Sequence, residues 1–420
     1  MIFVAGILLA LAALLGAPLF AVLAAGGLLT AWHSGLDPAV LPSQILRLAE
    51  SPNLLAIPLF TLAGVTLSRG GAPQRLVQLF TSAFGWLSGG LAVVAITACA
   101  FFTAFSGASG VTILALGGLL YPMLRQERYP QRFSLGLLTA SGSSGLLFPP
   151  SLVVLFYGVV AGVDIGKLFL AGIVPGALLL AMLSLYSVGI ARKSGATKVR
   201  FVWTRAISDV EGAAFDLLLP IGIVVSLIGG YITATEAASG AAAYALLLEI
   251  VIHRQIRSRA ALIAIFRETA MLVGSLLAIL FIAVGLTNLL INAQVPMHLL
   301  AILEQSLTQK WQFLLLLNGF LLLVGFVMDI FSATMVIVPL IVPLASHFGV
   351  NPIQLGIIFM ANLEVGYIHP PMGMNLFFAS QRFSEPVWRL FAAVLPFLAI
   401  MLAWLLAITY IPVLSLWWQR

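Results

Sequence analysis

The sequence predicts an all-α, polytopic membrane protein that is built from two inverted repeats. Three observations lead to this fold class: an apolar composition, a motif pattern that recurs at one offset, and an uneven distribution of positive charge. Hydrophobic residues make up 61% of the 420 residues and charged residues only 8%, whereas a soluble domain carries roughly 25% charged residues. We therefore expect a lipid bilayer to surround most of the chain.

The apolar residues are arranged in runs of the kind that form membrane helices, which need about 20 residues to cross a bilayer. Such runs are Leu54 to Leu67, Phe169 to Ala191, Leu217 to Ile232 and Leu272 to Leu290. The N-terminal run, Ile2 to Ala31, lacks a basic leader and is too long for the apolar part of a signal peptide. We expect it to stay in the membrane, as one kinked helix or as two short ones around Pro18.

A shift of 221 residues brings the two halves of the chain into register. Four prolines then fall on prolines and two glycines on glycines, and the proline matches alone are more than chance predicts for a chain with 21 prolines. The superposed pairs are Pro122 and Pro343, Pro149 and Pro370, Pro150 and Pro371, Pro175 and Pro396, Gly64 and Gly285, and Gly145 and Gly366. Each half thus holds one Gly-x-x-x-Pro-Pro motif, which indicates an internal repeat.

The positive charges give the two repeats opposite orientations. Sixteen of the twenty Lys and Arg residues lie in the ranges 69–84, 125–132, 192–216, 253–270 and 380–390. By the positive-inside rule these ranges are cytoplasmic and the C-terminus is outside. The first interrupted apolar stretch, Gly85 to Leu124, then opens from the cytoplasm and the second, Trp311 to Ser346, from outside. The net charge of +6 is thus a signal of topology, and no nucleic acid is expected as a partner.

Four segments interrupt the expected membrane helices with small, polar or Pro residues: 105–112, 141–151, 328–334 and 362–375. Non-helical backbone at membrane depth survives only where protein buries it or where it lines a wet cavity. Carbonyls freed at the end of a half-helix suit Na⁺, and the amides that begin the next half-helix suit an anion. The alternative is that the Gly and Ser residues only allow helices to pack closely.

Two acidic residues, Asp329 and Glu364, stand in apolar surroundings where an unpaired charge is costly. Each is a candidate for a cation site or a proton relay, and the alternative is the capping of a broken helix. Glu236 is expected to form a capping box with Thr233. Cys99 is the only cysteine, and the five histidines show no metal-ligand spacing, so Na⁺ is the one metal ion expected.

Three further stretches carry a resemblance to a known family. They are Gly166 to Gly172 followed by Pro175-Gly176, Gly229 to Ala238, and Asn362 to Gly366 continuing through Pro370-Pro371 to Phe377. With these motifs the chain resembles, over essentially its whole length, the large membrane subunit of the tripartite ATP-independent periplasmic (TRAP) transporters, the DctM-like family.

The resemblance implies an elevator-type secondary transporter of the bacterial inner membrane, whose C-terminus the charge distribution places in the periplasm. Na⁺ would be the coupling ion and no other cofactor is implied. The implied partners are a small four-helix membrane subunit, expected as a separate chain, and a periplasmic substrate-binding protein that delivers an organic anion. Scaffold helices are expected in residues 1–84 and, after a basic linker, in 192–310. The mobile hairpin, broken helix and long helix of each repeat are expected in residues 85–191 and 311–420.

The resemblance also implies site residues. One Na⁺ site would use Ser106, Ser109, Gly142 and Ser143, and the other would use Asp329, Ser332, Thr334 and Gly366. Substrate would lie between the two tips, near Thr112, Ser151 and Asn375. The helix breaks themselves would be set by Gly145, Pro149, Pro150, Pro370 and Pro371. Ser143 and His369 depart from the family pattern, which leaves the substrate open rather than the mechanism.

Three other functions fit parts of the sequence. Gly107-Ala-Ser-Gly110 and Gly142-Ser-Ser-Gly145 resemble the serine motif of rhomboid intramembrane proteases, although no histidine follows on the next helices to activate the serine. A self-sufficient divalent-anion/Na⁺ symporter would share the hairpins and inverted repeats. A passive channel is disfavoured because nothing in the sequence suggests a continuous polar pore.

Overall fold

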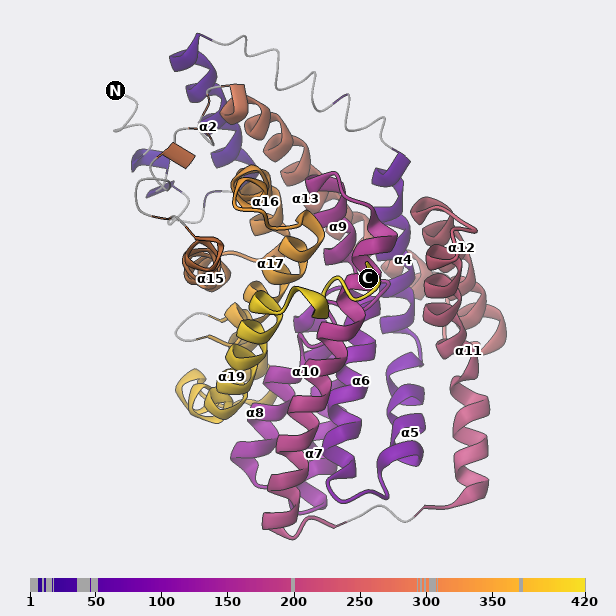
Figure 1. Ribbon diagram of the computed structural model, residues 1–420. Coiled ribbons are helices and arrows are strands. Elements are labelled where there is room, and N and C mark those ends of the chain that lie inside the picture. Colours follow the sequence, from indigo (N-terminus) through magenta and orange to yellow (C-terminus); the bar gives the residue numbers. More distant parts are fainter. Residues whose placement is uncertain are drawn as a thin grey trace.

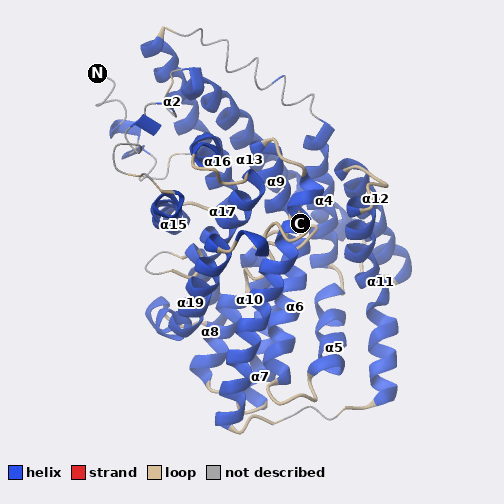
Figure 2. Ribbon diagram, viewed as in Figure 1, coloured by secondary structure: helices blue, strands red, loops and turns tan. Residues whose placement is uncertain are grey.

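The computed structural model describes residues 7–9, 11–12, 17, 19–35, 46, 52–197, 201–292, 294, 297, 300–301, 307, 309–369 and 373–419. Every regular element in these ranges is a helix (Figure 2). Six of the described helices are long and apolar enough to cross a bilayer, which confirms the predicted all-α, polytopic fold class. Pro370 and Pro371 lie outside the described residues, as do Gly16 and Pro18, where the shape of the N-terminal run was left open.

The helices follow one another along the chain as shown in Figure 1. Their bounds are α2 Leu19–Ser34, α4 Ala56–Arg69, α5 Ala72–Phe84, α6 Gly90–Ser106, α7 Ser109–Gln126, α8 Gln131–Ser141, α9 Leu152–Ala161, α10 Ile165–Ser194, α11 Trp203–Ile228, α12 Ala234–Leu247, α13 Arg259–Asn292, α15 Lys310–Val327, α16 Ile330–His347, α17 Pro352–Gly366, α18 Met374–Phe383 and α19 Val387–Tyr410. Short 3₁₀ turns cover Pro52–Leu55 and Pro412–Leu414, and a π-helical turn, Leu248–Ile252, continues α12.

Local sequence signals set several of these ends. The expected capping box is confirmed at α12, where the side chain of Thr233 accepts from the N–H of Glu236 and the carboxylate of Glu236 accepts from the N–H of Thr233. Asp164 caps α10 in a similar way, by accepting from the N–H of Lys167 at 2.7 Å. The long helix α10 ends at Gly195, whose φ of +65° is a left-handed conformation that glycine adopts without strain.

The helix bounds recur along the chain at the offset that the prolines indicate. The last residues of α6 and α15, Ser106 and Val327, are 221 residues apart, and so are the first residues of α7 and α16. The same offset joins the last residues of these two helices, Gln126 and His347, and the first residues of α8 and α17, Gln131 and Pro352. Each half therefore places a helix pair and an interrupted helix in the same order, and the helices of the two pairs match in length to within one residue.

The two halves are interleaved in space rather than side by side. In the first half α9 packs on α16, and in the second half α18 packs on α7 and α8. The long helix α19 lies along α8, and α10 contacts both α17 and α19. Each interrupted helix thus ends against the helix pair of the other half, so the core of this region is shared. Around it, α4 packs on α12 and α13, and α5 lies along α11 (Figure 1).

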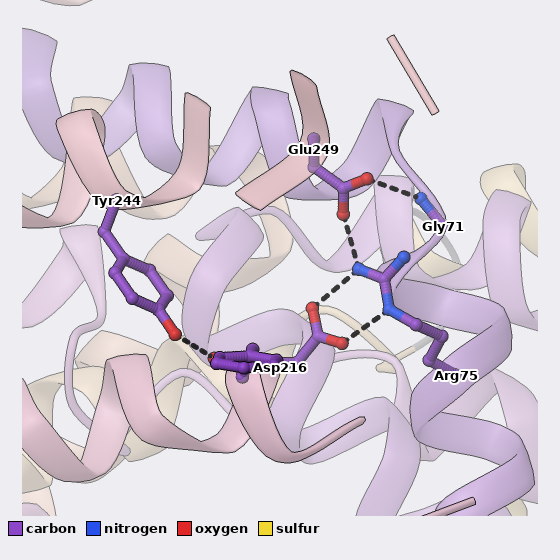
Figure 3. A network of polar contacts seen from close by, with 6 residues as sticks. Gly71, Arg75, Asp216, Tyr244 and Glu249 are labelled. Atoms are coloured by element: carbon purple, nitrogen blue, oxygen red, sulfur yellow. Dashed lines mark hydrogen bonds and ion pairs between the residues drawn. The ribbon is translucent and has the colours of Figure 1, made fainter. Parts of the chain in front are cut away.

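A buried ion cluster joins α4, α5, α11 and α12 (Figure 3). The guanidinium of Arg75 on α5 donates to both carboxylate oxygens of Asp216 on α11, at 2.6 and 2.7 Å, and to Glu249 at 2.5 Å. Glu249 lies in the π-helical turn and also accepts from the N–H of Gly71 at 3.2 Å. A Cβ on Gly70 would overlap the Glu249 carboxylate. The Gly70-Gly71 link between α4 and α5 therefore lies in direct contact with this carboxylate, which only glycine at position 70 allows.

Replacing Arg75 by Met is expected to destabilise the protein strongly, because two buried carboxylates would lose their shared cation. Removal of one partner from a buried ion pair costs about 3–5 kcal/mol. Thermal unfolding of the purified protein in detergent measures the effect. Arg69→Met is the matched control, since Arg69 pairs with Glu268 at the surface with half of its side chain exposed, where such a pair contributes about 0–1 kcal/mol. Equal shifts in the two variants would contradict the assignment of the cluster as a buried clamp.

Candidate ion and substrate site

The first helix pair turns at a tip formed by Ser106 to Ser109. α6 ends at Ser106, and Gly107 follows with a φ of +64°, its N–H donating to the carbonyl of Thr103 at 2.8 Å. A Cβ on Gly107 would lie 2.9 Å from the side chain of Leu152, the first residue of α9. Glycine is therefore required here both by the left-handed turn and by the close approach of the first break.

The first break runs from Ser141, where α8 ends, to Leu152, where α9 begins. Its backbone closes a series of tight turns, with the N–H groups of Leu146 and Phe148 donating to the carbonyls of Ser143 and Gly145 at 3.0 Å. A Cβ on Gly145 would overlap the carbonyl of Ala100 on α6. The glycine of this Gly-x-x-x-Pro-Pro motif thus lets the break pack directly on the first helix pair, as the packing interpretation of the small residues predicts.

Hydroxyl groups connect the tip to the first break. Thr103 donates to the carbonyl of Gly142 at 2.7 Å and shares a 2.6 Å hydrogen bond with Thr112, and both threonines are fully buried. The carbonyl of Ser109 lies 3.5 Å from the position that a Cβ on Gly142 would take. The predicted residues Ser109, Thr112 and Gly142 are therefore neighbours. Thr103 was missed in the sequence, although it lies one helical turn before Ser106 on the same helix.

The second half of the chain contributes Asn375 to this same place. Asn375, in the first turn of α18, donates its amide N–H to the carbonyl of Thr139 at 3.2 Å and to the hydroxyl of Ser143 at 3.4 Å. Its Oδ1 is buried and has no hydrogen-bond partner among the described residues, and the same is true of the hydroxyl of Ser151. Two polar groups assigned to substrate are thus buried near the first break with a free acceptor or donor.

The second helix pair turns at Asp329, which caps α16. Its Oδ1 accepts from the N–H groups of Phe331 and Ser332 at 3.0 and 3.1 Å, and the hydroxyl of Ser332 donates to its Oδ2. Capping therefore accounts for how the Asp329 charge is compensated. Thr334 donates to the carbonyl of Ile330 at 2.6 Å in its own helix, so it follows Asp329 and Ser332 along α16 without bonding to either.

A tyrosine links the second tip to the C-terminal end of α17. The hydroxyl of Tyr367 accepts from the N–H of Ile330 at 2.9 Å, so it satisfies a first-turn donor of α16 from the residue that follows Gly366. Gly366 itself packs against the backbone of Gly325 on α15, 2.7 Å from the position its Cβ would take. Tyr367 is not predicted as a site residue from the sequence, because nothing in its apolar surroundings distinguishes it from a packing residue.

Glu364 lies in the last turn of α17 and is fully buried. Neither of its carboxylate oxygens has a hydrogen-bond partner among the described residues. The neighbouring Asn362 instead donates to Oδ1 of Asn318 at 2.7 Å, and Asn318 donates to Thr409 at 3.2 Å. The simpler interpretation of Glu364, that its carboxylate caps a broken helix, therefore has no hydrogen bond to support it.

The chemistry of the two tips is similar. Each gathers hydroxyl and carbonyl oxygens at the start of a helix, and Asp329 is the one charged residue among the predicted site residues. Oxygen donors of this kind suit a hard monovalent cation, and half-helix N-termini suit an anionic group. The arrangement is thus able to hold a cation at a tip and an anion near the start of α9 or α18.

Comparison with known proteins identifies the family. Residues 5–414 match the family described as tripartite ATP-independent periplasmic transporter, DctM component. The C4-dicarboxylate TRAP transporter large permease protein DctM of Pseudomonas aeruginosa is 34% identical over 375 residues, which cover 89% of this chain and 87% of that protein. The ectoine TRAP transporter large permease protein TeaC of Halomonas elongata is 30% identical over 84% of this chain and 83% of its own length.

Two other proteins extend the comparison. The isethionate TRAP transporter permease protein DctMQ of Oleidesulfovibrio alaskensis is 33% identical over 97% of this chain, which spans 64% of that longer protein. The crystal structure of the YdaH transporter of Alcanivorax borkumensis shares the fold, with a TM-score of 0.61 at 16% identity over 90% of this chain and 87% of that one. These proteins are transporters, so the protease alternative is set aside. The chain belongs to the DctM component family of the TRAP transporters, and it is a multi-pass large permease subunit rather than an enzyme.

Proposed function

We propose that this subunit performs Na⁺-coupled, elevator-type uptake of an organic anion that a periplasmic binding protein delivers. A small four-helix membrane subunit would complete the complex in the bacterial inner membrane. The observation that carries the proposal is the meeting of both halves at the first break, where Asn375 of α18 donates to Ser143 and to the carbonyl of Thr139. Polar groups from both repeats would then contact the same substrate molecule.

Na⁺ coupling is supported by the donors available at each tip. The first site would take oxygens from Ser106, Ser109, Gly142 and Ser143, with Thr103 and Thr112 holding the Gly142 carbonyl in place. At the second site the Oδ2 of Asp329 is held by Ser332, and a hydroxyl that donates one hydrogen bond still has lone pairs for a cation. Capping and ion binding by Asp329 are thus compatible.

An anionic substrate is supported by the helix starts and by the relatives. Ser151 precedes α9 and Asn375 lies in the first turn of α18, where free amides and the helix dipole favour negative charge. The names of the relatives cover C4-dicarboxylates, isethionate and ectoine, and each of these molecules carries a carboxylate or a sulfonate. A carboxylate such as a C4-dicarboxylate or a sugar acid is the substrate class we propose here.

An elevator motion is supported by the interleaved packing. Because α9 packs on α16 and α18 packs on α7 and α8, the two halves of the site are packed together and are suited to move as one unit. The helix pairs, the interrupted helices and the long helices α10 and α19 would therefore travel together past α4, α11, α12 and α13.

Asp329→Asn is expected to weaken Na⁺ coupling without unfolding the second tip, because Asn caps a helix about as well as Asp. The carboxylate charge is lost while the cap is kept. We expect the Na⁺ concentration that half-saturates uptake in proteoliposomes to rise about tenfold, which corresponds to about 1.4 kcal/mol. Ser332→Ala should shift it in the same direction. An unchanged Na⁺ dependence in both variants would remove this site.

Asn375→Asp is expected to abolish uptake of an anionic substrate, because it adds a negative charge beside Ser143 and removes an amide donor. Asn351→Asp is the matched control: Asn351 caps α17 by accepting from Ile353 at 2.8 Å, and Asp serves this role equally well. Uptake and thermal stability are measured for both variants. Retained uptake in Asn375→Asp would exclude this residue from the substrate site.

The tripartite assembly is tested by uptake in proteoliposomes that hold this chain and its small subunit under an imposed Na⁺ gradient. We expect uptake only when the binding protein is present outside. Uptake that ignores the binding protein would favour the self-sufficient symporter, and uptake that ignores the Na⁺ gradient would overturn the proposed coupling.

A further inference from the structure

An apolar cavity of about 460 Å³ lies between the first break and α11. This volume falls within the range of ligand pockets, roughly 300–1,000 Å³. One wall belongs to α6 and the break and includes Phe105, Phe148 and Pro149, and the opposite wall is the segment Pro220 to Val225 of α11. None of the residues that line the cavity belongs to the hydroxyl-lined site described above.

The lining of the cavity excludes a polar ligand. Among the described residues that line it, Thr97 alone has a polar side chain. Its hydroxyl is directed at the carbonyls of Val93 and Val94 in its own helix, at 2.9 and 3.2 Å. Every other lining side chain is apolar, so an occupant would find no hydrogen-bond partner and must be a hydrocarbon.

Aromatic rings form a continuous side of the cavity. Phe80 on α5 contacts Phe84 and Phe101, with ring centroids 6.3 and 6.0 Å apart, and Phe101 contacts Phe105 at 5.1 Å. Phe148 packs over Gly176 on α10, where a Cβ would lie 2.7 Å from its ring. These rings contact one another along one side of the cavity, and an empty cavity would forfeit dispersion contacts on its walls.

The wall of the cavity on α11 belongs to an apolar membrane span with an exposed face. In the span Ala206–Leu227, only 28% of an 18-residue apolar window is buried within the described part of the chain. Ile221 and Val225 line the cavity and are still 56% and 58% exposed. A transmembrane helix of a partner subunit is too wide to enter, because one turn about 10–12 Å across and 5.4 Å high fills this volume. A flexible alkyl chain fits.

We propose that an acyl chain of a membrane phospholipid occupies this cavity and lies between the first break and α11. Such a chain contacts Phe148 and Pro149 on one side and Ile221 and Val225 on the other. If the break moves relative to α11, which rests on the proposed function, the lipid must leave or slide during each cycle. Occupancy itself does not depend on transport.

The experiment uses the full-length protein in nanodiscs of a phospholipid that carries a diazirine in one acyl chain. After irradiation, labelled peptides are mapped by mass spectrometry. We expect label at Phe101 or Phe105, on the wall of the cavity that α6 forms, which we call the inner wall. Bulk lipid should in addition label exposed residues such as Leu395 and Leu406 of α19. An inner wall that stays unlabelled while α19 is labelled would overturn the proposal.

Variants that fill the cavity provide the second readout. Val225→Trp and Ala104→Leu are expected to lower inner-wall labelling about tenfold, a factor equal to about 1.4 kcal/mol of affinity. Leu185→Trp is the control, since Leu185 is 74% exposed on α10 and does not line the cavity. Unchanged labelling in both filling variants, with unfolding temperatures like that of the control, would also overturn the proposal. Labelling is read without transport, so a failure of Na⁺ coupling leaves this test intact.

Discussion

Every interruption of a membrane helix releases backbone N–H and C=O groups that lipid cannot satisfy, and the organisation of this protein follows from that constraint. At the first break the backbone closes its own turns, and the carbonyl of Gly142 accepts from Thr103. At the second tip the first donors of α16 are taken by the carboxylate of Asp329 and by the hydroxyl of Tyr367. The groups that compensate the breaks are also the groups able to meet an ion or an anion.

Close packing and ligand binding, which began as competing interpretations of the small residues, are both present. Gly145 and Gly366 occupy corresponding positions in the two Gly-x-x-x-Pro-Pro motifs, and each touches the backbone of a neighbouring helix, at Ala100 and at Gly325. These contacts bring the break against the helix pair. The polar tips then lie close enough to the break for Thr103 to bond to the carbonyl of Gly142. Packing by glycine is thus a condition for forming the site rather than an alternative to it.

Features that depend on local chemistry could be predicted from the residues themselves, whereas contacts between distant residues could not, and only the family resemblance grouped Asn375 with Thr112 and Ser151. Helix interruptions, the cap at Asp329 as one alternative, and the Thr233–Glu236 capping box could be read from residue types a few positions apart. The bond from Asn375 to Ser143 spans 232 residues and the Arg75–Asp216 pair spans 141. No periodicity encodes such contacts, because the same Arg or Asn would fit an exposed position. A repeat predicts that the two halves resemble each other. It does not predict that the interrupted helix of each half packs on the helix pair of the other half.

This reciprocal packing of the two halves affects how the chain is synthesised and inserted. The first half leaves the ribosome before the second, yet α9 packs most extensively on α16, and α7 and α8 pack most extensively on α18 and α19, respectively. An inserted first half therefore exposes faces of α7, α8 and α9 that only later segments can cover. Release from the insertion machinery and escape from membrane proteases should both depend on synthesis of the chain through α19. A chain truncated after the first repeat should be degraded and should not accumulate in the membrane.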